Sequence, residues 1–415
     1  MAAKKFFGWI NTALLTIIMF ITFGLAMHSG TLYIVPVCNE MGITRTEYGV
    51  TLSIATLVGF FAALTLGRFL KILKSVKKVI TLGIFSCIIF LAIYGSAPNI
   101  YVMYISGFFR GFISPYLGIG LMSILVSKWF IDKKNIALGF IAFGSGIGGT
   151  ILSPIVSFFI TNFGWRGASL ISAGIIAVIS IPALLFVREE PEKYGQLPLG
   201  MKAEGDSEYQ NRPLKGLLVE LAPKTPFFWV GIAGVALGSV AASTFYINSA
   251  AMLEEKSLAP VLIPPAISAL FLFNTIAKAG VGVILDKFGI KKTMIISYIL
   301  IMISSVCMLF AGNPAFAFLY AVLFGLGFSF FSSPFAALVE NLVGPKDYGS
   351  IIGYFMAAMQ FGQSLAPIIT GAAFDITGSY NIAIIMMVAF IFTSLIVLMK
   401  ALKMSEKYFA ERLPS

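Results

Sequence analysis

Three ionisable side chains, His28, Arg110 and Lys278, stand in stretches of the sequence that are otherwise apolar. A charge in an apolar environment is costly unless water or a partner compensates it, so such residues are candidates for binding an anion or carrying a proton. Asn274 precedes Lys278 by one helical turn, which lets the amide orient the ammonium group or bind a ligand. His28 is the single histidine, and its side chain can exchange a proton near neutral pH.

Other kinds of chemistry have no support in the sequence. Cys38, Cys87 and Cys307 lie in or beside apolar segments without the paired spacing of a zinc site or a disulfide framework. No grouping of nucleophile, base and metal ligands is apparent, so we expect neither an enzyme nor a cofactor.

The composition indicates which elements must position these residues. The 415 residues are 58% hydrophobic and 11% charged, which is typical of a chain that lies in a lipid bilayer. Apolar stretches of about 20 residues recur throughout, and each can cross a hydrocarbon core roughly 30 Å thick. They predict an all-α membrane protein with twelve transmembrane helices, because helices satisfy the backbone in lipid. The expected helices cover 7–37, 48–68, 78–97, 99–127, 135–161, 166–187, 226–252, 262–285, 292–311, 315–343, 349–374 and 380–401.

Lys and Arg residues set the expected orientation. With both termini in the cytoplasm, the outer loops contain only Arg45, Arg166 and Lys256 of the 29 Lys and Arg residues, while Arg110 and Lys278 lie within helices. Basic loops stay in the cytoplasm, so we expect a multi-pass protein of the cell (inner) membrane with cytoplasmic termini. The net charge of +11 then meets anionic lipid head groups, and no nucleic-acid partner is expected.

A polar interruption divides the chain into two related halves. Laying one half over the other aligns Pro154 with Pro367. Such a duplication is typical of transporters with two six-helix bundles and a binding site between them. The expected parts are an N-terminal bundle, a cytoplasmic linker, a C-terminal bundle and a cytoplasmic tail, at 1–187, 188–225, 226–401 and 402–415 respectively.

A motif after the eighth expected helix points to a family. The segment GVILDKFGIKK, which begins at Gly282 and contains Asp286 and Lys287, resembles the signature loop of the major facilitator superfamily. That resemblance implies that Gly282, Asp286 and Lys287 form an inner gate, with the acid facing the positive N-terminus of a neighbouring helix. The corresponding loop of the first half has Lys71 where the family has an acid.

Within that superfamily, three patterns resemble the oxalate/formate antiporter and monocarboxylate transporter group. They are the turn around Trp129, the run from Asn274 to Lys278, and the helix end at Asp375. The resemblance implies that Lys278 replaces an Arg that pairs with the substrate carboxylate, which keeps the charge but loses the two-pronged guanidinium. Cations that some members carry in helices 1 and 11 are absent here, where the chain has Thr31 and the region of Gln360.

These arguments give two sets of candidate residues. The substrate-binding candidates are Lys278, Asn274, Arg110, Tyr116, Tyr33, Gln360 and Gln363, and the proton-coupling candidates are His28 and Arg110. Each has a structural alternative: Lys278 could reach toward the cytoplasm, Arg110 could bind backbone carbonyls, and His28 could be a packing residue.

The leading hypothesis is a secondary active transporter of a small organic anion, in particular a monocarboxylate. It would work by alternating access with proton symport or anion exchange, as a monomer in the bilayer. The positive interior, with no acid deeper than Glu340, favours an anion. The alternatives are an efflux carrier for drugs or other small molecules, which an acid in the cavity would favour, and a non-transporting membrane sensor, which would usually carry a soluble signalling domain.

Overall fold

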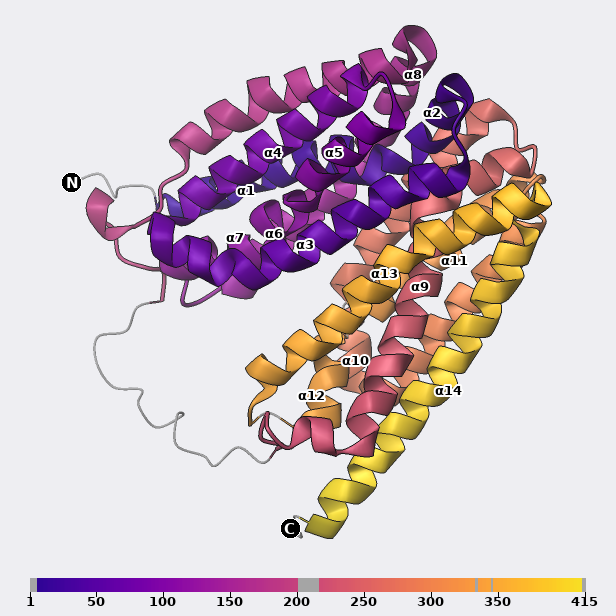
Figure 1. Ribbon diagram of the computed structural model, residues 1–415. Helices are drawn as coiled ribbons and strands as arrows, with labels where there is room; N and C mark the ends of the chain where they lie inside the picture. The colour runs from indigo at the N-terminus through magenta and orange to yellow at the C-terminus, as the bar shows by residue number, and fades with distance from the viewer. Residues whose placement is uncertain (1–5, 201–215, 333–334, 345, 413–415) are drawn as a thin grey trace. The chain divides into compact units, whose positions relative to one another are not determined.

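The computed structural model describes residues 6–200, 216–332, 335–344 and 346–412, and these residues are almost entirely helical (Figure 1). The chain forms two compact units. Unit 1 contains Met1–Ile43 and Val50–Asp206, and unit 2 contains Thr44–Gly49 and Ser207–Ser415. The predicted all-α membrane fold is therefore confirmed.

The described part of unit 1 contains eight α-helices and an irregular segment. The α-helices are α1 (Gly8–Thr22), α2 (Ile34–Met41), α3 (Arg45–Leu73), α4 (Val76–Ser96), α5 (Ile100–Gly111), α6 (Ile113–Leu117), α7 (Ile119–Trp129) and α8 (Lys134–Phe186). Between α1 and α2 the chain forms a π-helix, η1 (Phe23–Met27), and a 3₁₀ helix, η2 (His28–Tyr33). Helix α8 packs against α1, η1, η2 and α4, so it is the central element of this unit.

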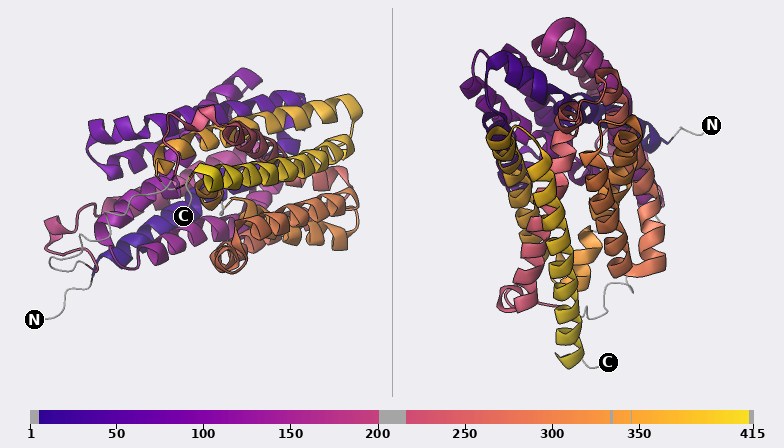
Figure 2. Two further views of the ribbon diagram at one scale, coloured as in Figure 1. Left: turned by 90° about the horizontal axis from the view of Figure 1, so that it is seen from below. Right: turned by 90° about the vertical axis from the view of Figure 1, so that its right-hand side faces the viewer.

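The described part of unit 2 contains six longer helices. They are α9 (Pro226–Glu255), α10 (Ile263–Leu309), α11 (Pro314–Ser332), α12 (Phe335–Val343), α13 (Tyr348–Thr377) and α14 (Asn381–Arg412). Helix α9 lies beside α13 and α14, and α10 packs against α11 (Figures 1 and 2).

Two helices, α8 of unit 1 and α10 of unit 2, are too long for one crossing of a bilayer. A straight helix of 53 residues, the length of α8, would span about 80 Å, far more than a hydrocarbon core of about 30 Å. Helix α8 turns at Gly164 (φ 68°, ψ 168°) and α10 turns at Gly289 (φ 71°, ψ 169°). This left-handed φ is readily available only to glycine. Each helix therefore contains two of the predicted spans.

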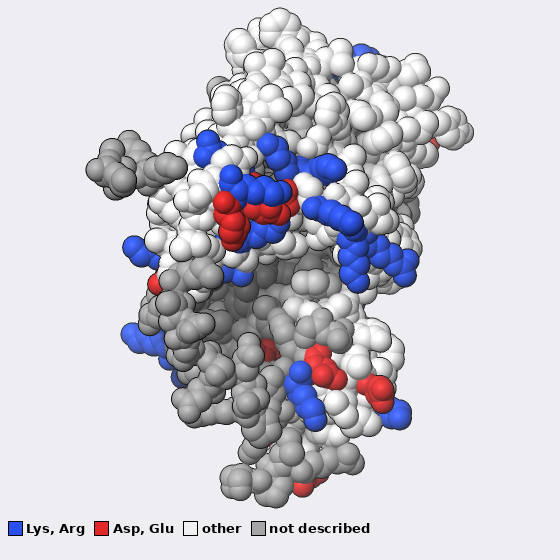
Figure 3. Space-filling model, turned by 90° about the vertical axis from the view of Figure 1, so that its left-hand side faces the viewer, with Lys and Arg blue, Asp and Glu red and all other residues white. Residues whose placement is uncertain are grey.

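The apolar character of the helices extends to their surface. Among the described residues, nine helices are long and apolar enough to cross a membrane. Large apolar side chains are exposed, for example Ile376 at 83% and Val178 at 73%. On the face drawn in Figure 3, wide areas contain no Lys, Arg, Asp or Glu. These surfaces suit contact with lipid tails.

Two expected helices are less regular than the sequence predicted. The first, at 7–37, changes from α to π to 3₁₀ geometry before it becomes α-helical again. The fourth, at 99–127, is divided into α5, α6 and α7. Gly118 adopts an extended conformation at the end of α6 (ψ 169°), and Pro115 within α6 has no N–H to donate to the helical hydrogen-bond ladder. Such breaks often mark functional positions in helices.

Candidate functional site

The irregular segment between α1 and α2 carries His28 at the first position of η2. Its Nε2 atom lies 3.0 Å from the hydroxyl oxygen of Ser145 on α8, and its ring contacts Phe23. The side chain is half-buried, and Ser145 is 8% exposed. A histidine that the sequence marked as a candidate for proton exchange is thus held by a hydroxyl group of another helix.

Arg110 lies against the same irregular segment from α5. A Cβ atom placed on Gly30 would be 3.1 Å from the Nη2 atom of Arg110, so the absence of a side chain at Gly30 leaves room for the guanidinium. The guanidinium also lies over the ring of Phe90, 5.5 Å from its centroid. Among the described residues Arg110 forms no ion pair. The structure therefore brings Arg110 and the helix-1 segment that contains His28 together.

The two candidate tyrosines of unit 1 have ring partners. Tyr33 is 3% exposed and contacts Tyr94 edge-on, with centroids 5.7 Å apart. Tyr116 is also 3% exposed and packs against Phe69 and Phe112. These contacts make both tyrosines part of the packing of unit 1, whether or not they also bind a substrate.

The strongest candidate of unit 2, Lys278, has an exposed side chain on α10. No described carboxylate forms an ion pair with it. Asn274, one turn earlier, is 4% exposed, and its amide donates a hydrogen bond of 3.3 Å to the carbonyl of Gly325 on α11. Asn274 thus uses hydrogen-bonding capacity for the packing of α10 against α11. Gln360 and Gln363 are half-buried on α13.

The predicted gate residues belong to α10. The surroundings of Gly282 and the side chain of Asp286 lie outside the described part of the structure, so the proposed contact of Asp286 stays a prediction. Lys287 is exposed, with its Nζ atom 5.5 Å from the centroid of the Phe288 ring. The glycine of the motif that follows Phe288 is Gly289, at which α10 turns.

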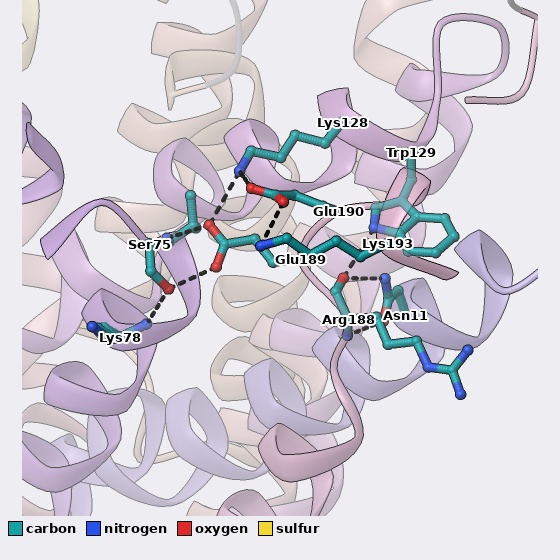
Figure 4. Close-up of polar contacts among 10 residues, drawn as sticks. Asn11, Ser75, Lys78, Lys128, Trp129, Arg188, Glu189, Glu190 and Lys193 are labelled. Carbon is teal, nitrogen blue, oxygen red and sulfur yellow. Dashed lines mark hydrogen bonds and ion pairs between the residues drawn. The ribbon is translucent and has the colours of Figure 1, made fainter. Parts of the chain in front are cut away.

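A polar network at one end of unit 1 was not expected from the sequence (Figure 4). The carboxylate of Glu189 accepts hydrogen bonds from the Ser75 hydroxyl (2.6 Å), the Val76 N–H (2.7 Å) and the Lys128 ammonium (3.1 Å). Burial acts to raise the pKa of Glu189, but these hydrogen bonds and the Lys128 charge outweigh burial, so the pKa lies below its ordinary range. Glu189 therefore stabilises the N-terminus of α4.

Arg188 connects the same region to α1 and α7. Its backbone N–H donates to the side chain of Asn11, and its carbonyl accepts from the Asn11 amide (2.7 Å) and the Trp129 indole (3.0 Å). Its guanidinium lies over the rings of Phe7 and Tyr194 (3.9 and 4.3 Å to the centroids). The start of the expected linker at 188–225 is therefore fixed to unit 1. Lys128 and Trp129 belong to a motif noted in the sequence, and this motif was the signal that could have indicated the network.

Asp375 has a similar capping function within unit 2, which includes Thr44–Gly49 at the start of α3. Its carboxylate accepts hydrogen bonds from the backbone N–H groups of Arg45 (3.0 Å) and Thr46 (2.9 Å). Backbone N–H groups at the start of a helix have no partner within the helix, so a carboxylate at this place is favourable. The helix-end motif that contains Asp375 thus has a structural role.

Two units of apolar helices define a multi-pass membrane protein. The model of the Major Facilitator Superfamily matches residues 13–278 and 249–412, and the chain belongs to this superfamily. The expected family is therefore confirmed.

Curated relatives match at low identity. Monocarboxylate transporter 12 of Xenopus laevis is 25% identical over 283 residues, which cover 63% of this chain and 60% of the relative. The oxalate:formate antiporter of Oxalobacter formigenes is 26% identical, covering 71% of this chain and 67% of the antiporter. The probable L-galactonate transporter of Escherichia coli K12 is 26% identical, covering 84% and 79%.

Solved structures support the fold assignment. The nucleoside transporter NupG superimposes with a TM-score of 0.74 at 17% identity, over 95% of this chain and 98% of NupG. A bacterial homologue of the human lysosomal transporter Spinster, in an inward-facing conformation, gives a TM-score of 0.72 at 12% identity over the full length of both chains. The named relatives and structures are all transporters.

Proposed function

We propose that the protein is a secondary active transporter of a small organic anion, in particular a monocarboxylate. It works by alternating access, with proton symport or anion exchange. The observation that carries this proposal is a cation in each unit, Arg110 and Lys278, for which no described carboxylate serves as an ion-pair partner. The names of the curated relatives, which include monocarboxylates, oxalate, formate and galactonate, support the same class of substrate.

Lys278 is the principal residue for binding the carboxylate. Insertion scales place the cost of a lysine at the centre of a membrane helix at about 2.5 to 3.5 kcal/mol, so an exposed Lys278 requires water or an anion nearby. A charge-assisted hydrogen bond to a carboxylate is about twice as strong as a neutral one. Its single ammonium group places less geometric demand on the anion than a guanidinium fork would.

Unit 1 supplies a second positive charge and a group that can bind a proton. Arg110 provides a permanent positive charge against Gly30 of η2, and His28 lies two residues earlier on the same 3₁₀ helix. A histidine can bind and release a proton at physiological pH, which an arginine cannot do. We assign proton coupling to His28 and anion attraction to Arg110.

The cellular setting of this function follows from the charged loops. With the twelve expected helices, most Lys and Arg residues fall on the same side as both termini, so we propose that this side is cytoplasmic and that the protein acts in the cell (inner) membrane. A monomer suffices, because one chain supplies both units of the superfamily fold.

A ligand screen with purified protein tests the proposal. A bound ligand at one hundred times its dissociation constant stabilises a protein by about 2.7 kcal/mol, which is visible as a rise in melting temperature. We expect stabilisation by formate, L-lactate or oxalate, and none by a neutral sugar or a tetraalkylammonium ion. Stabilisation by the cation alone would instead favour the efflux alternative.

Variants of α10 make the screen specific. Lys278→Gln should abolish stabilisation by carboxylates, whereas Lys278→Arg should retain it, since the charge is preserved. Lys292→Gln removes an exposed lysine of the same helix after the turn at Gly289 and serves as the matched control. A folded Lys278→Gln protein that binds the carboxylate with wild-type affinity would show that the anion binds elsewhere.

A further inference from the structure

The hydroxyl group of Ser145 differs from most hydroxyl groups in the helices of this chain. Serine and threonine side chains in membrane helices commonly bond to the carbonyl one turn earlier, as Thr12 does to Gly8 and Ser153 to Gly149. The Ser145 hydroxyl instead lies 3.0 Å from His28 Nε2, on another helix. Its side chain is directed to the histidine and not to its own backbone.

Close approach of two helices produces this contact. A Cβ atom on Gly24 would lie only 2.8 Å from the carbonyl oxygen of Gly148, and one on Gly148 would lie 2.3 Å from that of Phe20. Because both positions are glycine, the chain from the end of α1 through η1 approaches α8 closely. His28 follows Gly24 by one turn and Ser145 precedes Gly148 by nearly one turn, so the two side chains meet directly beside the glycine contact.

A hydroxyl group suits a histidine that changes its protonation state. It can donate a hydrogen bond to Nε2 when the imidazole is neutral there, and it can accept one from Nε2–H when the ring is protonated. A carbonyl could only accept. The pair can therefore remain hydrogen-bonded when His28 gains or loses a proton, which avoids an unsatisfied group in a half-buried position.

The charged residues on the elements around η2 decide whether a proton at His28 can be coupled to an anion. Of the elements that pack against η1 and η2, α8 carries the charged residues Lys134 and Arg166 and α2 carries Glu40. Glu40 and Arg166 pair with each other (3.1 Å). Lys134 begins α8, and Cys38 and Tyr33 are the further titratable groups of α2 and η2. Arg110 is the charged residue that lies against η2 itself.

We propose that Ser145 is a positioning residue that holds His28 in both protonation states on the short helix η2, which Arg110 contacts at Gly30. A second positive charge on η2 is unfavourable next to Arg110 unless an anion is present. Proton binding at His28 and anion binding at Arg110 therefore favour each other, as linkage requires. This inference rests on the proposed transport of an anion and specifies how the proton joins it.

The single histidine of the chain allows a direct test. Protein without a histidine tag, labelled with ¹⁵N-histidine and placed in lipid nanodiscs, yields one imidazole titration curve by NMR. We expect Ser145→Ala to lower the titration midpoint by about one pH unit, a tenfold loss of proton affinity, because hydrogen bonds to the charged form are the stronger ones. Ser145→Thr keeps the hydroxyl and should restore the midpoint. Ser153→Ala, on the same helix, is the matched control.

The role of the anion is measured separately in the same samples. Saturating formate should raise the midpoint of the wild-type protein, and Arg110→Gln should raise it without formate and remove the formate effect. A midpoint unchanged by Ser145→Ala would overturn the assignment of Ser145. An effect of Ser145→Ala together with no response to formate, L-lactate or oxalate would retain the positioning of His28 but refute its link to an anion and with it the proposed proton coupling.

Discussion

Glu189 caps a helix that begins 113 residues earlier in the chain. Its Oε1 atom accepts a hydrogen bond of 2.7 Å from the backbone N–H of Val76, at the first residue of α4. The neighbouring N-cap, Ser75, donates its hydroxyl to the same carboxylate and accepts the N–H of Lys78 (3.2 Å). The segment that follows α8 thereby holds the start of α4 in place.

Removal of the Glu189 charge should destabilise unit 1. In Glu189→Gln the hydrogen bonds to Val76, Ser75 and Lys128 lose their ionic character, and we expect a loss of about 1 to 3 kcal/mol in unfolding free energy. Thermal unfolding in detergent measures the change. Glu190→Gln is the control, because the ion pair of Glu190 with Lys193 is exposed and its contact with Lys128 is long (3.9 Å), so both should contribute less than the bonds of Glu189. Equal losses in both variants would contradict the capping role.

The same residue predicts a dependence on pH. Because the pKa of Glu189 is lowered in the folded protein, the unfolded state binds more protons as the pH falls. The stability from Glu189 should therefore be complete above about pH 4.3, the ordinary value of a glutamate, and should be lost as the pH falls through the lowered folded value. Melting temperatures of the wild type and Glu189→Gln should differ by a constant amount near neutral pH and converge in acid.

The signature loop predicts unequal effects of two substitutions. Asp286→Asn should slow carboxylate uptake into liposomes while leaving affinity within a few fold, since the motif predicts that this acid stabilises the closed inner gate. Lys71→Ala should change uptake little, because the first copy of the loop has no acid at that position. A matching loss of uptake in the two variants would show that both copies act in the gate.

The proposed orientation can be checked by cysteine labelling. Cys38, Cys87 and Cys307 are buried, so a cysteine introduced at an exposed position is the one that an impermeant maleimide reaches first. A cysteine at Lys193 should react only from the cytoplasm, and one at Pro98, between α4 and α5, only from outside. Reactivity on the opposite sides would reverse the topology.

The fold was predictable from the sequence because the expected spans and their order depend on apolar stretches of fixed length. The breaks in helix 1 were not, since π and 3₁₀ geometry at Phe23–Tyr33 preserves the same apolar composition as an α-helix. Arg110 and Lys278 could be recognised as candidates for binding, because each is a charged residue in an apolar stretch. The partner of His28 could not be predicted from the sequence, because Ser145 lies 117 residues away and resembles any other small residue in a glycine-rich helix. The Glu189 network was missed because Glu189 lies in a segment whose polarity is typical of a linker, and its partners Ser75 and Lys128 are far away in the sequence.

The turn at Gly164 also has a consequence for how the chain enters the membrane. The two spans of α8 are joined through one non-helical residue, so the connection between them is short. We expect the two spans to insert together during synthesis, as a helical hairpin. A β-branched residue at Gly164 would strain the left-handed turn, and the first sign of that strain should be the fraction of newly made chains that insert, before any loss of transport in the chains that do.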